Sequence, residues 1–167
     1  MAVLETHIFK AHNNIYIEQP EENYRTREIR TEMVFPDCVN ENTGMLVLIP
    51  GYGGNIDSHV FRKMREVFAE QYNLITVQCD YFGNKFMDVK QPEEMKLIAT
   101  MENIVNAEIY YKVEDFETVE EFNDMGIMQA IDIVSSTICA IYEIIRKGYV
   151  FNTNKIILFG TSHGAYL

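Results

Sequence analysis

The stretch KIILFGTSHGAYL, at positions 155–167, decides how this sequence is interpreted. Its four apolar residues at 156–159 form a continuous run, which is typical of a strand buried on both faces of a parallel sheet. The run leads directly into GTSHG at 160–164, and the residues that follow are able to open a helix. A G-x-S-x-G pattern arises by chance in about one chain in twenty of this size. The predicted strand and helix around it, however, are the context that a nucleophile elbow requires.

In a nucleophile elbow the central residue sits in a strained conformation on a sharp turn, and its neighbours two positions away must be small. Gly160 and Gly164 occupy those positions. We therefore expect Ser162 to be an exposed nucleophile, and the backbone N–H of His163 to face the place where an oxyanion forms. The alternative is a glycine-containing turn between a strand and a helix, without catalytic chemistry.

A second signal is LVLIPGYGG at 46–54, where an apolar run over 45–49 ends in a loop that contains Gly51, Gly53 and Gly54. The second oxyanion donor of such a site comes from a loop after an earlier buried strand. We assign this donor to the backbone N–H of Tyr52. A phosphate-binding loop is the competing interpretation, because glycines before a helix N-terminus also bind anions. The spacing matches neither G-x-G-x-x-G nor G-x-x-x-x-G-K-[ST].

The loop should lead into an amphipathic helix with Asp57 or Ser58 as its N-cap. A further apolar run at 74–79 then predicts a strand parallel to 45–49, because a helical crossover of this length joins parallel strands. Asp80 follows that strand, where it could line the site or simply form a turn. His59 stands near the start of the helix and is expected to be solvated or part of the capping region.

The flanking segments complete the expected architecture. Segments 6–17 and 27–35 mix β-branched, aromatic and charged residues and predict half-buried antiparallel strands, with one apolar face in the second of them. A long helix is expected over 126–147, with Gly148 as its stop. Its expected apolar face comprises Ile127, Ile131, Val134, Ile138, Ile141 and Ile145. Residues 84–124 carry 11 acidic and 4 basic side chains and predict an excursion, either a lid or a solvated face.

Composition narrows the class of protein. The 167 residues are 47% hydrophobic, enough for the core of a single domain spanning 1–167. The formal charge is -11, so the surface field should repel the phosphate backbone of nucleic acids and the headgroups of anionic lipids. We therefore expect neither as a partner. Three widely spaced cysteines, Cys38, Cys79 and Cys139, suit free, mostly buried thiols. We expect a cytoplasmic protein with no membrane span, metal or organic cofactor.

The two motif segments, with the helix between them, resemble the α/β-hydrolase superfamily over about residues 25–167. The stretch FNDMGIMQAIDIV at 122–134 also resembles an uncharacterised bacterial group, the domain-of-unknown-function family 2920. This resemblance implies a doubly wound, mostly parallel sheet and the hydrolysis of an ester, thioester or amide through an acyl-enzyme on Ser162. Pro50 stands where many lipases of the superfamily carry a histidine, so the class of acyl substrate, small molecule or peptide, stays open.

The triad is where the sequence departs from that pattern. The acid and the histidine follow the nucleophile in this fold, but only three residues follow Gly164, and the four histidines, His7, His12, His59 and His163, lie at or before the elbow. The expectation is the N-terminal part of a serine hydrolase, incomplete on its C-terminal side and inactive by itself. The alternative is a non-catalytic truncated remnant or interaction module, and the apolar GAYL ending favours truncation. Self-association through an uncovered sheet edge is expected in either case.

Overall fold

The computed structural model describes residues 2–17, 27–84, 122, 124 and 126–167. They form a five-stranded mixed sheet in the order β1-β2-β4-β3-β5. Strands β1 (Val3–Lys10) and β2 (Glu28–Phe35) are antiparallel to their neighbours, as predicted for the N-terminal segments. The other strands, β3 (Gly44–Ile49), β4 (Leu74–Cys79) and β5 (Ile156–Gly160), run parallel to one another. The α/β class is therefore confirmed.

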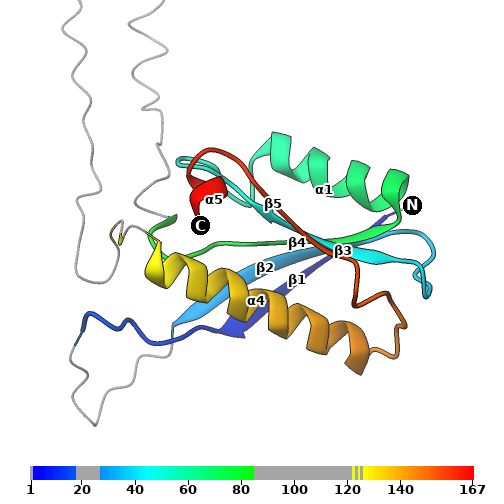
Figure 1. The fold of residues 1–167 in the computed structure, drawn as a ribbon, viewed down its shortest axis with the longest axis horizontal. Helices are drawn as coiled ribbons and strands as arrows, with labels where there is room; N and C mark the ends of the chain where they lie inside the picture. Colours follow the sequence, from blue (N-terminus) through cyan, green and yellow to red (C-terminus); the bar gives the residue numbers. More distant parts are fainter. Residues whose placement is uncertain (1, 18–26, 85–121, 123, 125) are drawn as a thin grey trace, which may run out of the picture.

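Two helices cover opposite faces of this sheet (Figure 1). Helix α1 (His59–Tyr72) joins β3 to β4, and α4 (Ile127–Arg146) precedes β5. The larger core cluster lies between the sheet and α4, and a smaller one lies under α1. Ser58 is the N-cap residue of α1, but its side chain makes no capping hydrogen bond. Asp57 pairs instead with Arg30 at 2.6 Å.

The first predicted strand, 6–17, is wrong in its boundaries. Strand β1 ends at Lys10, and a turn follows in which the N–H of Ile17 donates to the carbonyl of Asn14. The Asn14 side chain also accepts a hydrogen bond from the N–H of Tyr16 at 2.9 Å. An asparagine that bonds its own backbone two residues on competes with strand pairing, so residues 14–17 form a turn instead of continuing the strand.

The prediction of a half-buried β2 is also wrong, because this strand lies inside the sheet, between β1 and β4, and both faces are covered. Glu32 on the α1 side is buried together with Arg65 of α1, whose side chain is fully inaccessible. Arg65 donates to Glu32, to the side chain of Gln78 and to the carbonyl of Ile56. We call Arg30, Glu32, Asp57, Arg65, Gln78 and Asp80 the α1 charge network.

Helix α4 lies where it was predicted, but most of the face that was expected to pack on the sheet is exposed instead. Of the predicted apolar face, Ile127, Val134, Ile138 and Ile145 are exposed. The side toward the sheet holds Met128, Ile133, Ala140 and Ile144 together with three buried polar residues, Gln129, Asp132 and Ser136. Each of these three has a partner: Ser136 bonds Thr31 at 2.9 Å, Asp132 bonds Arg27 at 2.6 Å, and Gln129 bonds His163 at 2.8 Å. Because these polar groups have hydrogen-bond partners, they can be buried at little cost.

The end of α4 follows the expected stop signal. Gly148 has a φ of 79°, and its N–H donates to the carbonyl of Ile145 while that of Tyr149 donates to the carbonyl of Ile144. These two bonds define a Schellman motif, which needs a left-handed residue at the position of Gly148. By length and composition α4 could also cross a membrane, but a helix packed in a protein core passes the same test.

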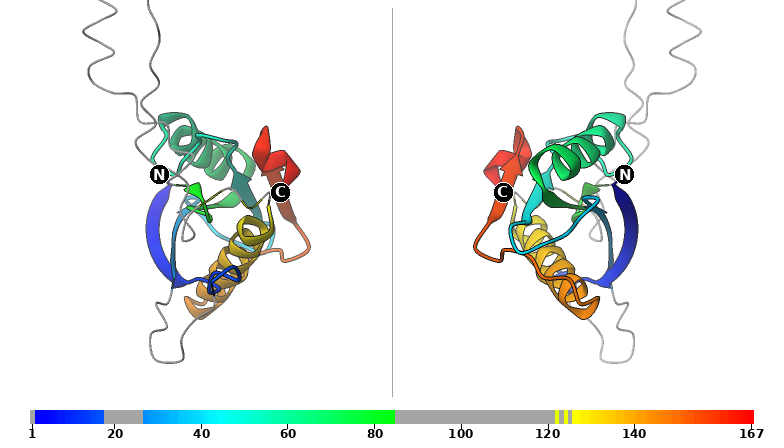
Figure 2. Two further views of the ribbon diagram at one scale, coloured as in Figure 1. Left: turned by 90° about the vertical axis from the view of Figure 1, so that its left-hand side faces the viewer. Right: turned by 90° about the vertical axis from the view of Figure 1, so that its right-hand side faces the viewer.

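The strand expected at 156–159 is present as β5, but it is not buried on both faces and forms the uncovered sheet edge expected from the sequence. Strand β5 is the edge strand and pairs only with β3 among the described strands. Its four apolar side chains remain 38–64% exposed. Figure 2 shows β5 and the C-terminal turn at one margin of the sheet and β1 at the other. The predicted acidic excursion at 84–124 lies almost wholly outside the described residues.

The three cysteines are free thiols, but only one is fully buried. Burial raises the pKa of Cys79 to about 12, while Cys139 is half-buried and Cys38 is exposed, contrary to expectation.

Candidate active site

The backbone at Ser162 has the strain that a nucleophile elbow requires. Ser162 follows β5, precedes the short helix α5 (His163–Tyr166) and has φ 52° and ψ -121°. Among the described residues, Ser162 and Asn73 are the two non-glycine residues with positive φ. Asn73 is in the ordinary left-handed helical region with ψ 58°, whereas Ser162 lies outside it. Such a conformation costs about 1–3 kcal/mol and persists only where its surroundings enforce it.

Neighbouring backbone atoms, not side chains, exclude any larger residue at the two glycines of the elbow. A Cβ on Gly160 would lie 2.1 Å from the carbonyl oxygen of Gly164, and a Cβ on Gly164 would lie 2.2 Å from the carbonyl oxygen of Ile49. Neither obstacle can rotate away. The strand, the turn and α5 are therefore packed too closely for any residue except glycine at these two positions.

The loop after β3 lies against the elbow. A Cβ on Gly51 would lie 2.7 Å from the carbonyl oxygen of Thr161 and 2.9 Å from the Cβ of Ser162. The N–H of Thr161 donates to the carbonyl of Ile49 at 3.2 Å, which ties the two segments together. Two segments more than a hundred residues apart in the sequence thus lie in contact, and Tyr52 directly follows the contact residue Gly51.

This loop is itself folded into a tight turn. The N–H of Gly54 donates to the carbonyl of Gly51 at 2.9 Å, and Gly53 has a φ of 77°. Positive φ at the third residue of a four-residue turn is the requirement of a type II turn. Tyr52 occupies the second position and its side chain is exposed, so its backbone is part of a fixed turn next to Ser162.

Tyr81 is a residue at this site that the sequence interpretation missed. Its buried hydroxyl donates to the carbonyl of Pro50 at 2.8 Å and so holds the start of the loop. Burial raises the pKa of the Tyr81 phenol, which keeps the hydroxyl protonated as a donor. The sequence signal for this role was the position of Tyr81 just after β4, because β3 and β4 are parallel and the residues that follow them lie at the same end of the sheet.

The ring of His163 is held by helix α4 and is not hydrogen-bonded to Ser162. The ring Nε2 is hydrogen-bonded to the side chain of Gln129 on α4 at 2.8 Å. The ring is thereby directed toward α4, and the backbone N–H, at the first position of α5, has no acceptor within that helix. Gln129 is fully buried and was also missed, because it stands on a helix face that was expected to be exposed.

The histidines of the chain are engaged elsewhere. His7 pairs with Glu5 at 3.0 Å on β1, His12 bonds the carbonyl of Asn13, and His59 is the first residue of α1. Among the described residues, which include all four histidines, no side chain is hydrogen-bonded to Ser162. Ser162 and the two backbone N–H groups predicted as donors therefore lie on adjoining segments, and within the described ranges no histidine ring is placed to act as a base.

Asp80 belongs to the α1 charge network rather than to the elbow. Its carboxylate lies 3.7 Å from Arg30 and 3.5 Å from the side-chain nitrogen of Asn84. Burial raises the pKa of Asp80 above its usual range, against the opposing effect of Arg30. Within the described ranges, no group of three or more His, Cys, Asp or Glu residues is placed to hold a metal ion.

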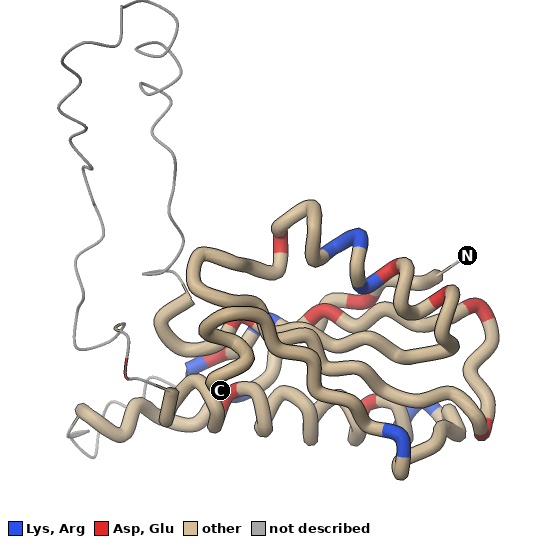
Figure 3. The backbone as a smooth tube through the Cα atoms, turned by 45° about the horizontal axis from the view of Figure 1, so that its top comes forward, with Lys and Arg blue, Asp and Glu red and all other residues tan. Residues whose placement is uncertain are grey.

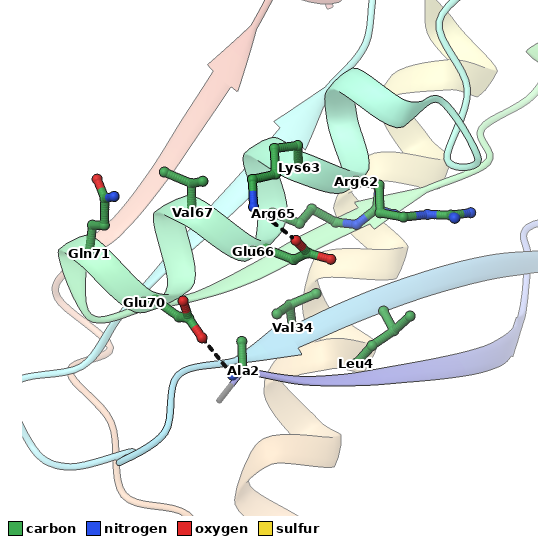
Figure 4. Close-up of a pocket in the computed structure, with 10 residues that line it drawn as sticks. All are labelled: Ala2, Leu4, Val34, Arg62, Lys63, Arg65, Glu66, Val67, Glu70 and Gln71. Carbon is green, nitrogen blue, oxygen red and sulfur yellow. Dashed lines mark hydrogen bonds and ion pairs between the residues drawn. The ribbon is translucent and has the colours of Figure 1, made fainter.

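A surface hollow of about 470 Å³ lies away from the elbow, between α1 and the strands β1 and β2 (Figure 4). Leu4, Val34 and Val67 supply its apolar lining and Arg62, Lys63 and Glu66 supply charged groups. None of the predicted site residues lines it. It is the open space beside a helix that covers only part of the sheet.

Comparisons with known proteins add no relative: no family model and no curated protein matches this chain. The resemblance to the α/β-hydrolase superfamily therefore rests on the motifs and on the geometry described above.

Proposed function

We propose that this chain forms the nucleophile half of a serine hydrolase site of the α/β-hydrolase type. Ser162 would attack the carbonyl of an ester, thioester or amide, and the N–H groups of His163 and Tyr52 would stabilise the oxyanion. The strand order, with β4-β3-β5 parallel and α1 and α4 on opposite faces, is compatible with the doubly wound sheet of that class.

One observation carries the proposal, namely a serine in a strained backbone conformation with a glycine two positions to either side. Close backbone atoms leave no room for a side chain at either glycine, and the loop at Gly51 contacts the serine. Strain of this kind clusters at functional sites, because elsewhere a relaxed residue would cost less. An ordinary strand–helix connection has no need of φ 52° and ψ -121° at a serine.

The proposed reaction also needs a general base that accepts the proton of Ser162 Oγ. The ring of His163 is bonded to Gln129, so it does not serve. Among the described residues, no side chain is placed to act as that base or as the acid that would orient it. Without them, the chain should hydrolyse p-nitrophenyl acetate no faster than its Ser162→Ala variant.

Chemical rescue of the missing base tests the preformed half of the site. Adding free imidazole should allow a fluorophosphonate probe to label the chain, and Ser162→Ala should abolish the labelling. Ser58→Ala is the matched control, since the Ser58 side chain makes no capping hydrogen bond. Absence of imidazole-dependent labelling, or equal labelling of the Ser162→Ala variant, would remove Ser162 from the proposed role.

A second candidate function is a non-catalytic interaction module. The exposed apolar side chains of β5 favour it, because an open apolar edge strand invites pairing with another chain. The two functions differ at Ser162: a module would tolerate Ser162→Gly with a gain in stability, and it would show no rescue by imidazole.

A further inference from the structure

The outward side of α4 is an apolar stripe exposed along the whole helix. Five side chains of this stripe each expose 55–64% of their surface, namely Ile127, Val134, Ile138, Tyr142 and Ile145. Ile131 and Ile141 flank them and are half-buried. Patches of this kind mark interaction surfaces when they are contiguous, whereas scattered single exposed residues need no explanation. We define these seven residues as the α4 stripe.

From the α4 stripe we infer that α4 pairs with α4 of a second copy of this chain, antiparallel and about a two-fold axis near residue 136. Its isoleucine and valine positions alternate in steps of four and three residues, which is the heptad spacing of helices that pack side by side. This pairing goes beyond the proposed hydrolase function and does not depend on it.

The six isoleucine and valine residues of the stripe are symmetric about residue 136, as a two-fold contact requires, and Tyr142 alone has no counterpart in the stripe. Ile127 and Ile145 are equidistant from that residue, as are Ile131 and Ile141, and Val134 and Ile138. An isologous interface places the same patch of both copies face to face, so each member of a pair meets the other member on the second copy. All three pairs are aliphatic with aliphatic.

Charge supports a second copy of the chain as the occupant. Most of α4 is tan in Figure 3, whereas α1 carries several charged residues. The half-buried Glu143 and the exposed Arg146 lie in the last turns of α4 and bond each other at 2.7 Å. In an antiparallel pair they meet the uncharged first turn of the other helix.

The available area is enough for a modest dimer. An aromatic side chain can bury about 150–250 Å² of surface, and an aliphatic one somewhat less. The five half-exposed side chains can therefore bury roughly 500 Å² per copy. A symmetric pair then removes roughly 1,000 Å² in total, the least area expected of a biological interface. The expected dimer is therefore reversible and dependent on concentration.

Sedimentation velocity over about a hundredfold range of concentration tests this pairing. The 167-residue chain should shift from monomer to dimer, and Ile138→Glu should weaken the dimer by at least about 100-fold, because it places charge against an apolar partner. Val60→Glu is the matched control: Val60 is 66% exposed on α1, and its substitution should leave the dimer unchanged. Circular dichroism verifies that both variants are folded.

A charge-swap experiment tests the register. Val134→Lys alone should also be monomeric, but a mixture of the Val134→Lys and Ile138→Glu chains should form a heterodimer, because residue 134 faces residue 138 of the other copy. A wild-type chain that stays monomeric, or that is monomeric and binds neutral lipid vesicles, overturns the proposal. A dimer that survives Ile138→Glu, or a mixture of folded variants that does not associate, overturns it as well.

Discussion

The elbow at Ser162 and the α1 charge network lie on different parts of the sheet and hold it by different physical means. At the elbow, close approach of backbone leaves room only for glycine at Gly160 and Gly164. At the centre of the network, the buried Arg65 of α1 is hydrogen-bonded to the buried side chains of Glu32 on β2 and Gln78 on β4. The elbow depends on glycines, which have no side chain to clash, and the α1 charge network depends on paired charges. Substitutions should therefore damage them in different ways.

Gly160→Ala should cause the largest loss of stability. Overpacking in a core of movable side chains costs about 1–3 kcal/mol, and here the obstacle is a carbonyl oxygen at 2.1 Å. We expect a loss of more than about 3 kcal/mol, measured by urea unfolding.

The control is Gly148→Ala, where φ is also positive but nothing lies within 4 Å of the added Cβ. It should cost only about 1 kcal/mol, the ordinary penalty of a left-handed alanine. Equal losses in both variants would mean that the elbow is not limited by close packing.

Arg65→Met should cost about 3 kcal/mol in the free energy of unfolding, because it leaves the buried carboxylate of Glu32 without its main partner. The loss should fall at the lower end of the usual range, since Arg30 remains 3.6 Å from Glu32.

The double variant Arg65→Met with Glu32→Leu separates charge from packing. Removing both charges should recover much of the loss, because a buried pair contributes little beyond a well-packed apolar replacement. A double variant no more stable than the single one would show that shape, not charge, holds this region.

The smallest expected effect is on how the free energy of unfolding depends on pH, where Asp80 and Asp57 of the network should act in opposite directions. Burial raises the pKa of Asp80, so the folded state binds this proton more tightly than the unfolded state, and stability falls as pH rises above about 4. The hydrogen bond from Arg30 lowers the pKa of Asp57, so its contribution is lost as pH falls below about 4.

Urea midpoints of the wild type, Asp80→Asn and Asp57→Asn between acid and neutral pH measure both slopes. Subtracting each variant from the wild type should give curves of opposite slope. Curves of the same sign would contradict the assignment of burial to Asp80 and of pairing to Asp57.

Much of the secondary structure could be predicted because its signals are local. The apolar runs at 45–49 and 74–79 are bounded by proline, glycine or aspartate, and they match β3 and β4 closely. The ends of α4 follow from Gly126 and Gly148 in the same way. The exposure of the β5 side chains could not be predicted from the apolar run alone, because such a run has the same appearance in a central strand and at an edge.

The helix α4 shows why periodicity alone is insufficient. Its most apolar side was expected to face the sheet, yet Gln129, Asp132 and Ser136 face it instead. Hydrogen bonds from other elements satisfy these polar groups, and a sequence pattern contains no information about such distant partners.

For the candidate site, the sequence by itself determined the serine, the glycines at fixed distances from it and the loop that precedes α1. These features are local, because small residues are required wherever a strand turns sharply into a helix. Only the tertiary structure decided that Gly51 touches Ser162, that the Tyr81 hydroxyl holds Pro50, and that Gln129 turns the His163 ring away. Those contacts join residues from 31 to more than a hundred positions apart, and chain packing alone brings such residues within hydrogen-bond distance.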